Sequence, residues 1–279
     1  MSLKRIAVVG LGLIGGSLAA RSRKAFPRVR IVGVSRNRGA LARAKRKKWI
    51  HEGTDHLEQG IQSADLIVLC TPVDTLKSLL KRIDRAARSP VVVTDAGSVK
   101  GFLVRWADRQ KWRHLRFVGA HPMAGSHQRG IEAAQPNLFD HALTFVTPGN
   151  KTPDTAFRQV KKFWAKVSQK VAVISPETHD RLTAEVSHLP HLVASLLVAG
   201  TDPQSLRFAA SGFLDTTRVA KSDPGLWAPI FTENRKELLR ALDRFGSQIR
   251  RAKRMLQKGN PQTLRKILRE VQKRRAALE

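Results

Sequence analysis

Two polar residues follow apolar, strand-like runs, and their types suit proton transfer. Ser98 lies in DAGSVK (95–100), after PVVVTDA, and His121 lies in VGAHPMAGSH (118–127), within RFVGAH. Histidine can accept a proton near neutral pH, and a serine hydroxyl can orient it. The pattern predicts acid–base chemistry with His121 as the base and Ser98 as its partner. His127 closes the same segment, so the elements around both histidines must decide between them.

A glycine-rich turn, Gly10-x-Gly12-x-x-Gly15, follows the run KRIAVVG and opens a helical stretch. In this context the first glycine permits a tight turn, the second lets a pyrophosphate approach the backbone, and the third lets helix and strand pack closely. The helix N-terminus then offers free N–H groups to the anion. The turn predicts a dinucleotide site.

The end of the second strand, VGVSRNR, bears on the choice of dinucleotide. Proteins that bind NAD usually carry Asp or Glu at this position, where it hydrogen-bonds the ribose 2′-hydroxyl. Ser35 and Arg36 stand in that place, and they offer a hydroxyl and a charged fork suited to a 2′-phosphate. The sequence therefore predicts NADP as the preferred cofactor, with NAD possible.

The elements that must position these residues alternate between strands and helices as far as about residue 175. Strands are expected at 4–10, 30–35, 65–70, 90–96, 116–121, 143–148 and 171–175, with helices at 11–24, 40–48, 73–86, 99–109 and 154–166. This alternation favours an α/β fold of the Rossmann type, with a parallel sheet covered on both faces. Ser98 and His121 then share the carboxyl edge of the sheet, where such folds bind ligands.

The strand signals stop after residue 175. Ser175-Pro176-Glu177 is a typical helix start, and Pro190 should interrupt the helix that follows. Apolar residues then recur every three or four positions from Arg235, and Gly259-Asn260-Pro261 separates two helices. We therefore expect a dinucleotide-binding domain at 1–175 and an all-helical domain at 176–279.

Composition narrows the class of protein. Of 279 residues 42% are hydrophobic, enough for a core. The run LVASLLVAG (192–200) is about half the length of a membrane span, and the N-terminus has no signal-peptide pattern, so no membrane association is expected. One cysteine, Cys70, is typical of the cytoplasm. The absence of tyrosine excludes a tyrosine general acid.

The net charge of +29 is gathered in blocks. Residues 21–48 carry twelve Lys and Arg and no acid, and residues 235–279 carry fifteen against four acids. A nucleic-acid-binding protein is one interpretation, but aromatic residues are only 6% and do not interleave with the basic ones. We interpret the blocks as solvated faces that attract anionic ligands, with no specific nucleic-acid partner.

His188 and His191 lie three apart, so on a helix they share a face. A bare HxxH lacks the glutamate of the HExxH zinc pattern. We expect no metal site.

Six segments, in this order, resemble the prephenate/arogenate dehydrogenases of tyrosine biosynthesis and cover both expected domains. They are GLGLIGGSL (10–18), VLCTPV (68–73), TDAGSVK (94–100), GAHPMAGS (119–126), ETHDRLTAEVSHLPH (177–191) and GFLDTTRVAKSDPGLW (212–227). The resemblance implies an N-terminal Rossmann domain, a helical domain that forms a homodimer, and a small-molecule substrate bound between the two.

The resemblance also implies roles for single residues. His121 takes the proton of the substrate's 4-hydroxyl, Ser98 supports it, and Arg218 binds a substrate carboxylate. Asp215 is expected to anchor Arg218 through a local ion pair. The cofactor set is expected to comprise Gly10, Gly12, Leu13, Ile14, Gly15, Ser35, Arg36, Thr71 and Pro72.

The substrate wall is implied to include His188 and His191, while Trp227 can equally be a core aromatic. His179 is expected at the surface or between the domains. His127 stands where several prephenate-using members carry glutamate, so the choice between prephenate and arogenate stays open. Another two-domain Rossmann dehydrogenase, of the 3-hydroxyacid type, is the alternative, although it would depend on a lysine in the helical domain.

Overall fold

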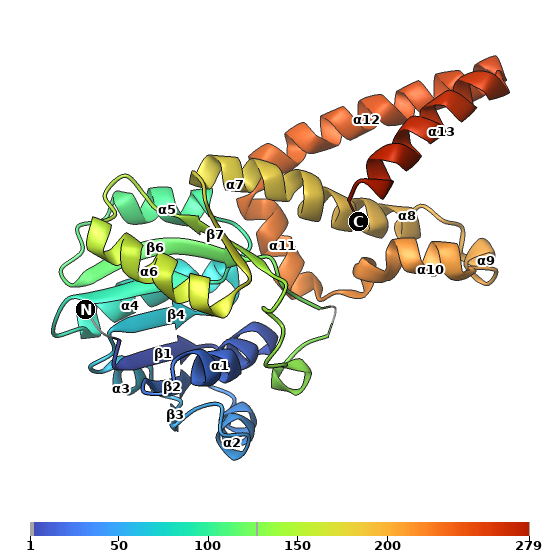
Figure 1. Cartoon of the computed structure of the whole chain (residues 1–279). Coiled ribbons are helices and arrows are strands. Elements are labelled where there is room, and N and C mark those ends of the chain that lie inside the picture. Colours follow the sequence, from blue (N-terminus) through green and yellow to red (C-terminus); the bar gives the residue numbers. More distant parts are fainter. Residues whose placement is uncertain (1–2, 127, 279) are drawn as a thin grey trace.

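An eight-stranded sheet forms the first part of the computed structural model, which describes residues 3–126 and 128–278. The strand order is β3-β2-β1-β4-β5-β6-β7-β8 (Figure 1). The strands are β1 (Arg5–Val9), β2 (Arg30–Val34), β3 (Glu52–Thr54), β4 (Leu66–Leu69), β5 (Val91–Asp95), β6 (Leu115–Pro122), β7 (Leu143–Thr147) and β8 (Lys170–Val173). The chain crosses over between β1 and β4, which is where Rossmann-type sheets bind dinucleotides.

Helices cover both faces of the sheet, as the alternating pattern predicted. They are α1 (Leu13–Ala25), α2 (Arg38–Arg46), α3 (Leu57–Ile61), α4 (Leu76–Ala86), α5 (Gly101–Asp108) and α6 (Asp154–Val167), with short turns η1 (Val73–Thr75) and η2 (Ile131–Ala133). One core packs α1, α2 and α6 on the sheet, and the other packs α3, α4 and α5. The strands between these layers are buried on both sides, which explains their nearly continuous apolar sequences.

The predicted fold class is confirmed with two refinements. The short elements β3 and α3 were not expected from the sequence, since three and five residues are too few to show a periodicity. The sheet is also not wholly parallel, because β7 runs antiparallel to β6, and β8 then pairs parallel with β7.

Only helices follow β8. They are α7 (Pro176–Thr183), the π-helical turn η3 (Ala184–His188), α8 (Leu189–Ala199), α9 (Pro203–Leu206), α10 (Ser211–Thr217), η4 (Arg218–Lys221), α11 (Pro224–Glu233), α12 (Arg235–Lys258) and α13 (Pro261–Ala276). The Ser175 hydroxyl accepts a hydrogen bond from the Thr178 N–H, which confirms the predicted helix start. The interruption expected at Pro190 takes the form of the π turn just before it.

The two long C-terminal helices form a hairpin that projects away from the sheet (Figure 1). Gly259 ends α12 in the left-handed conformation with φ of 61°, and the Asn260 side chain caps α13 by accepting from two backbone N–H groups. Both features follow the predicted Gly-Asn-Pro turn.

The helical part meets the sheet through two helices. The first helix, α7, packs on α5 and β7, and α11 packs on η1 beside the cofactor turn. The continuous helix Pro176–Ala199 is long and apolar enough by length and composition to cross a membrane. His179, His188 and His191 of this helix are buried within the protein. We therefore interpret the helix as a packing element between the two parts of the molecule.

Candidate active site

His121 lies near the end of β6, where that strand leaves its parallel neighbour. The β5–β6 pairing ends at Thr94 and Val118, whereas β6 continues and pairs through His121 with Phe145 of β7. The imidazole is 8% exposed, so it is a buried group at the carboxyl edge of the sheet.

A chain of hydrogen bonds fixes the His121 ring. Its Nδ1 lies 2.9 Å from Nε2 of His179, and Nδ1 of His179 lies 2.8 Å from Oδ1 of Asp180. Asp180 also accepts the backbone N–H groups of Lys100 and Gly101, each at 2.8 Å, at the N-terminus of α5. Because a carboxylate only accepts hydrogen bonds, Nδ1 of His179 carries the proton and donates to Asp180. Nε2 of His179 therefore accepts a hydrogen bond from Nδ1 of His121. This assignment leaves Nε2 of His121 as a free proton acceptor.

Electrostatics keep this acceptor neutral. Burial first, and then the neighbouring His179, Lys100 and His188, hold the pKa of His121 well below its ordinary value. Burial, with Lys100 and His188, likewise lowers the pKa of His179 to about 2. A neutral imidazole is the form that can act as a base.

The structure corrects two expectations about the partners of His121. No hydrogen bond joins Ser98 to His121 within the described residues, and the partner is His179 instead. His179 is fully buried between the two parts of the molecule, so the surface alternative is wrong. Ser98 is half-buried in the segment after β5, one residue before buried Val99.

His188 and His191 share a helical face, as predicted, and both meet Trp227. The His191 ring stacks on the indole at 3.7 Å between centroids with an angle of 9°, and the His188 ring meets it edge-on at 6.2 Å. Asn234 contacts Nδ1 of His188 at 3.0 Å. Nε2 of His188 and Nδ1 of His191 are buried without a protein partner, so each has a ring nitrogen for a polar ligand.

Trp227 is a core aromatic, and its role at the substrate wall stays a prediction. It packs against the core beneath α4 and α5, and its half-buried indole also backs the two histidines. No group of three or more potential metal ligands occurs among residues 3–126 and 128–278.

Arg218 begins η4 and is exposed, as is Asp215 one turn earlier on α10. The expected ion pair between them is not formed in the part of the chain that the structure describes, because both side chains extend into solvent. The predicted residue His127 lies outside the described residues. Its neighbour Arg129 forms an ion pair at 2.8 Å with Asp223, which caps α11.

The glycine turn has the geometry that a dinucleotide needs. Gly10 has φ of +93°, and a Cβ on Gly15 would lie 1.7 Å from the Gly10 carbonyl oxygen. A Cβ on Gly12 would meet no protein atom within 4 Å. Gly12 is the N-cap of α1 and no side chain caps this helix, so the N–H groups of its first turn lack a side-chain acceptor. The residues present fit a bound pyrophosphate.

The other predicted cofactor residues surround this turn in the topology. Ser35 and Arg36 follow β2, where Ser35 accepts from the Asn37 N–H at 3.2 Å and Asn37 caps α2. Thr71 and Pro72 follow β4 on the other side of β1, and Thr71 accepts a hydrogen bond from Thr75 at 2.8 Å.

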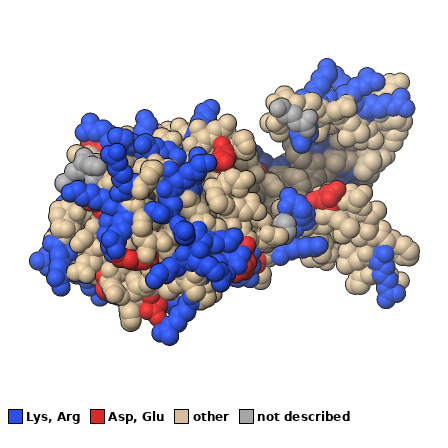
Figure 2. Space-filling view, turned by 60° about the horizontal axis from the view of Figure 1, so that its bottom comes forward, with Lys and Arg blue, Asp and Glu red and all other residues tan. Residues whose placement is uncertain are grey.

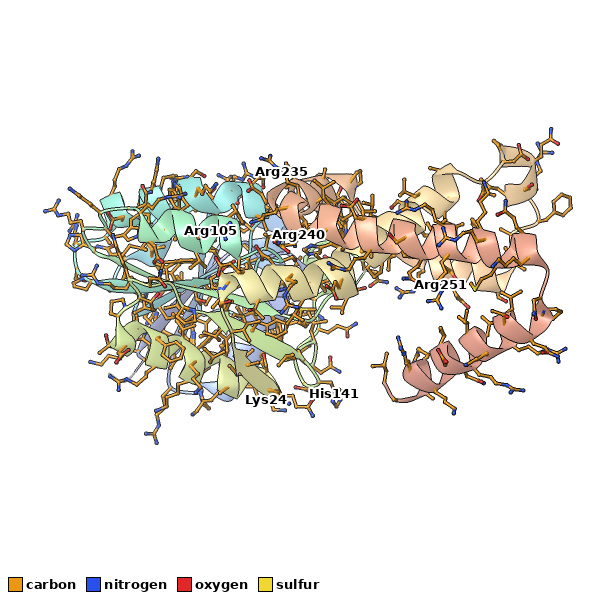
Figure 3. All side chains as sticks on the ribbon, turned by 90° about the horizontal axis from the view of Figure 1, so that it is seen from above. Lys24, Arg105, His141, Arg235, Arg240 and Arg251 are labelled. Carbon is orange, nitrogen blue, oxygen red and sulfur yellow. The ribbon has the colours of Figure 1, made fainter. Side chains whose placement is uncertain are left out.

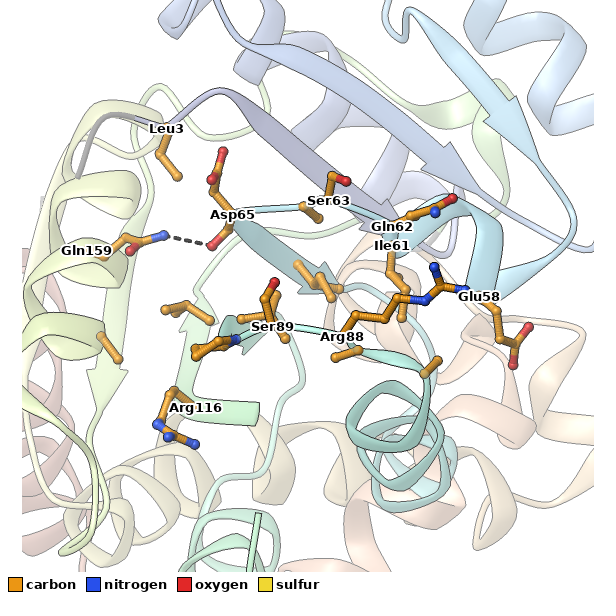
Figure 4. A pocket seen from close by; sticks show the side chains of 18 of the residues that line it. Leu3, Glu58, Ile61, Gln62, Ser63, Asp65, Arg88, Ser89, Arg116 and Gln159 are labelled. Atoms are coloured by element: carbon orange, nitrogen blue, oxygen red, sulfur yellow. Dashed lines mark hydrogen bonds between the residues drawn. The ribbon is translucent and has the colours of Figure 1, made fainter. Parts of the chain in front are cut away.

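A large hollow lies elsewhere, at the opposite edge of the sheet (Figure 4). It is lined by the segments that precede β4 and β5 and by α6, including Asp65, Ser89, Arg116 and Gln159. None of the predicted site residues lines it, so size alone does not mark the site of reaction.

Comparison with known proteins decides the family. The domain description "Prephenate dehydrogenase, nucleotide-binding domain" matches residues 18–173, and "Prephenate dehydrogenase, dimerization domain" matches residues 175–270. The chain belongs to the prephenate dehydrogenase family. The resemblance drawn from the six segments is thereby confirmed, and the protein is a dehydrogenase.

Individual members of the family match over most of their length. The chain is 37% identical to a prephenate dehydrogenase of Bacillus subtilis, covering 88% of this chain and 67% of the relative. It is 33% identical to a cyclohexadienyl dehydrogenase of Zymomonas mobilis, covering 99% and 96%. The crystal structure of Aquifex aeolicus prephenate dehydrogenase with hydroxyphenyl propionate and NAD+ has a TM-score of 0.92 at 33% identity, covering 100% of this chain and 99% of that one.

The alternative dehydrogenase class is not favoured. A 3-hydroxyisobutyrate dehydrogenase of Salmonella typhimurium superposes with a TM-score of 0.55 at 13% identity, covering 88% of this chain and 95% of that one, which is a likeness of fold alone. Synechocystis arogenate dehydrogenase, in contrast, reaches a TM-score of 0.82 at 29% identity, covering 99% and 100%.

The glycine turn predicts different outcomes for two alanine substitutions. Gly15→Ala should lower the Tm strongly, because its methyl group would overlap the Gly10 carbonyl. Gly12→Ala should leave the Tm unchanged but weaken cofactor binding by on the order of tenfold, since the methyl group occupies the space of the pyrophosphate. Thermal unfolding and cofactor titration measure the two effects. Equal Tm values and equal cofactor affinities for both variants would contradict the assignment.

The buried histidines predict a loss of stability in mild acid. The unfolded chain protonates His179 below its ordinary pKa near 6.5, whereas the folded chain keeps it neutral to about 2. The contribution of neutral His179 to the free energy of unfolding is therefore fully present above pH 6.5. It decreases as the pH falls, by about 1 kcal/mol between pH 7 and 5.5. Urea unfolding across this range should show a weaker pH dependence for His179→Asn than for the wild type. An identical pH dependence would show that His179 is charged in the folded protein.

Proposed function

We propose that this dehydrogenase oxidatively decarboxylates prephenate, with NADP as the preferred hydride acceptor and His121 as the base. The observation that carries the proposal is the His121–His179–Asp180 chain, which leaves Nε2 of a neutral His121 free at the carboxyl edge of the sheet. The family relationship supports the reaction, and the glycine turn supports the cofactor.

The chemistry needs a base, groups that orient the substrate and a bound hydride acceptor. A dinucleotide held at the glycine turn would supply the hydride acceptor for the ring carbon that carries the hydroxyl. His121 takes the hydroxyl proton as that carbon is oxidised, and the C–C bond to the ring carboxylate breaks to release carbon dioxide. The electron pair of that bond completes the aromatic ring, and the phenolic oxygen takes its proton back from His121. The His179–Asp180 pair stabilises the transient positive charge on His121.

Several residues are proposed to orient the substrate. Arg218 offers a guanidinium fork to a carboxylate, and Ser98 offers a hydroxyl. His188 and His191, backed by Trp227, offer the two unpartnered ring nitrogens. His127 and Asp215 are proposed to influence selectivity from the rim.

We propose prephenate as the substrate in preference to arogenate, which carries an ammonium group on the side chain. The carboxylates buried beside His121 are those of Asp95 and Asp180. Asp95 is paired with Lys100, and Asp180 is bound by backbone N–H groups and His179. Within the described residues, therefore, neither carboxylate is free to receive an ammonium group, and a keto side chain needs none.

Two further features support the assembly and its place in the cell. Exposed apolar side chains line the helical part, including Leu196, Leu239, Ile249, Leu256, Leu268 and Val271, mostly on α12 and α13. Figure 3 shows the hairpin of these two helices projecting from the rest of the molecule with its side chains around it. An unpartnered apolar surface on a domain described as a dimerisation domain fits a homodimer. The single cysteine, Cys70, fits a cytoplasmic enzyme.

Replacement of the base tests the proposed reaction. His121→Asn should lower kcat with prephenate by on the order of 10²-fold or more, since general base catalysis contributes that much. Its control is His141→Asn, in which an exposed histidine outside the network is changed. Steady-state kinetics measures both, and wild-type turnover by the His121 variant would remove His121 from the mechanism.

Crossing both substrates with both cofactors tests the two preferences. Prephenate and NADP should give the highest kcat/KM. Arg36→Gln should raise the KM for NADP by roughly 10- to 100-fold, which is the loss expected for one charged hydrogen bond, and leave the KM for NAD nearly unchanged. Lys45→Gln removes another exposed charge of the same basic block as a control. Equal effects of the two substitutions would reduce Arg36 to a general surface charge.

A further inference from the structure

Lys100 is among the largest fully buried side chains of the protein, although its amine is a strongly hydrated group. It immediately precedes α5, and none of the chemical steps above requires it. Burial of an unpaired ammonium costs several kcal/mol, so a lysine in this position must be paired. Its pKa is lowered by burial, while Asp95 acts in the opposite direction.

The partners of Lys100 converge on the backbone beside His121. Its Nζ forms an ion pair with Oδ2 of Asp95 and donates to the Ala120 carbonyl at 2.9 Å. Oδ1 of Asp95 accepts from the Ala120 N–H at 3.1 Å. Both backbone polar groups of Ala120 are therefore bound by the two side chains, which we name the Asp95–Lys100 clamp.

The clamp supplies the hydrogen bonds that a longer β5 would make to the end of β6. The backbone ladder between β5 and β6 ends at Val118, two residues before Ala120. Beyond that point the groups of β6 that faced β5 would be buried without partners, at a cost of about 1–3 kcal/mol each. Asp95 is the last residue of β5, and with Lys100 it satisfies these groups by side chains.

The sequence beside His121 is adapted to this arrangement. A Cβ on Gly119 would lie 2.5 Å from Oγ1 of Thr147, 2.9 Å from a Val104 methyl and 3.3 Å from Cδ of Lys100. Glycine at position 119 therefore leaves room for the aliphatic part of the Lys100 side chain beside β6. The segment Gly119-Ala120-His121 thus combines the space for the clamp, the groups that it binds and the base.

Residue 100 also joins the clamp to the ring partners of His121. Its backbone N–H donates to Oδ1 of Asp180, which is the same oxygen that contacts His179. His121 is therefore supported twice, through its backbone by the clamp and through its ring by His179. Both supports meet at Lys100.

We propose that Asp95 and Lys100 are positioning residues for the dehydrogenase reaction, and that their buried ion pair fixes the β6 backbone so that Nε2 of His121 faces the substrate hydroxyl. The pair touches neither substrate nor cofactor and acts through His121. The proposal rests on the proposed role of His121 as the base.

The test removes both charges together, so that neither is left buried alone. Asp95→Asn/Lys100→Met should lower kcat by on the order of 10- to 100-fold, the range expected for a misplaced catalytic group. The KM values for prephenate and NADP should stay within about threefold, because the clamp contacts neither ligand. Wild-type kcat in a folded double variant would overturn the proposal.

The His121→Asn background separates positioning from general structural support. If the clamp acts through His121, adding Asp95→Asn/Lys100→Met to His121→Asn should change kcat by less than about twofold. A further 10- to 100-fold loss there would overturn the proposal. If His121→Asn alone retains wild-type turnover, the proposed base has failed instead, and the two failures are distinct.

A matched control lies at the opposite end of the same strand. The Asp84 carboxylate accepts three backbone N–H groups, from Arg113, His114 and Leu115, at the start of β6. Asp84→Asn should lower the Tm with kcat unchanged, which shows that loosening β6 far from His121 does not affect the reaction. If the double variant fails to fold, Asp95→Asn/Lys100→Gln also removes both charges but keeps polar side chains at both positions, and it should show a smaller kcat loss. An unchanged kcat in that variant would count against the clamp.

Discussion

The contact on which the rest of the site depends is the buried carboxylate of Asp180 at the N-terminus of α5. It accepts two backbone N–H groups that the helix leaves free, and the helix dipole favours a negative charge there. Because Asp180 belongs to α7, this group bonds the helical part directly to the sheet domain. The neighbouring Asn234 of α12 donates to the Asp180 carbonyl and contacts His188. The position of α7, and with it that of His179, follows from these bonds.

The same burial sets the chemistry of the histidines. A base in water near neutral pH is partly protonated, whereas an imidazole removed from water and placed near Lys100 remains neutral. Its Nδ1 is occupied by His179, so only Nε2 can exchange a proton with a ligand. Burial therefore selects both the protonation state and the reactive atom. The free energy of unfolding therefore decreases in acid, because the unfolded chain binds protons at histidines that stay neutral in the folded chain.

The features predicted correctly from the sequence are those encoded by neighbouring residues. The glycine turn, the Gly259-Asn260-Pro261 junction and the alternating strands depend on local conformation, and local conformation can be interpreted from short patterns. The partner of His121 could not be predicted in this way, since His179 lies 58 residues further along the chain. The sequence predicts Ser98 as the partner of His121 because it follows the adjacent strand. Sharing an edge of a sheet, however, does not bring two side chains into contact. Lys100 carries no sequence signal of burial, because lysine is ordinarily exposed. The short stretch His179-Asp180 within a well-capped helix is the one local sign that a carboxylate could orient a histidine.

The distribution of charge separates two physical tasks. The basic runs lie outside, as expected, since Lys45, Arg46, Lys47 and Lys48 are all exposed, and Figure 2 shows Lys and Arg spread over the visible face of the sheet domain. Exposed charges act over about 8–10 Å and weaken with salt, so they affect the rate at which anionic ligands arrive. Inside, Lys100 is the one fully buried lysine among the described residues and is neutralised by Asp95, and burial keeps His121 and His179 neutral. Such a field attracts prephenate, a dianion, more strongly than arogenate, whose ammonium group cancels one carboxylate charge, but it holds no group in place. Recognition of the side chain at close range depends on unpaired polar atoms such as Nε2 of His188 and Nδ1 of His191, whose positions are fixed by burial.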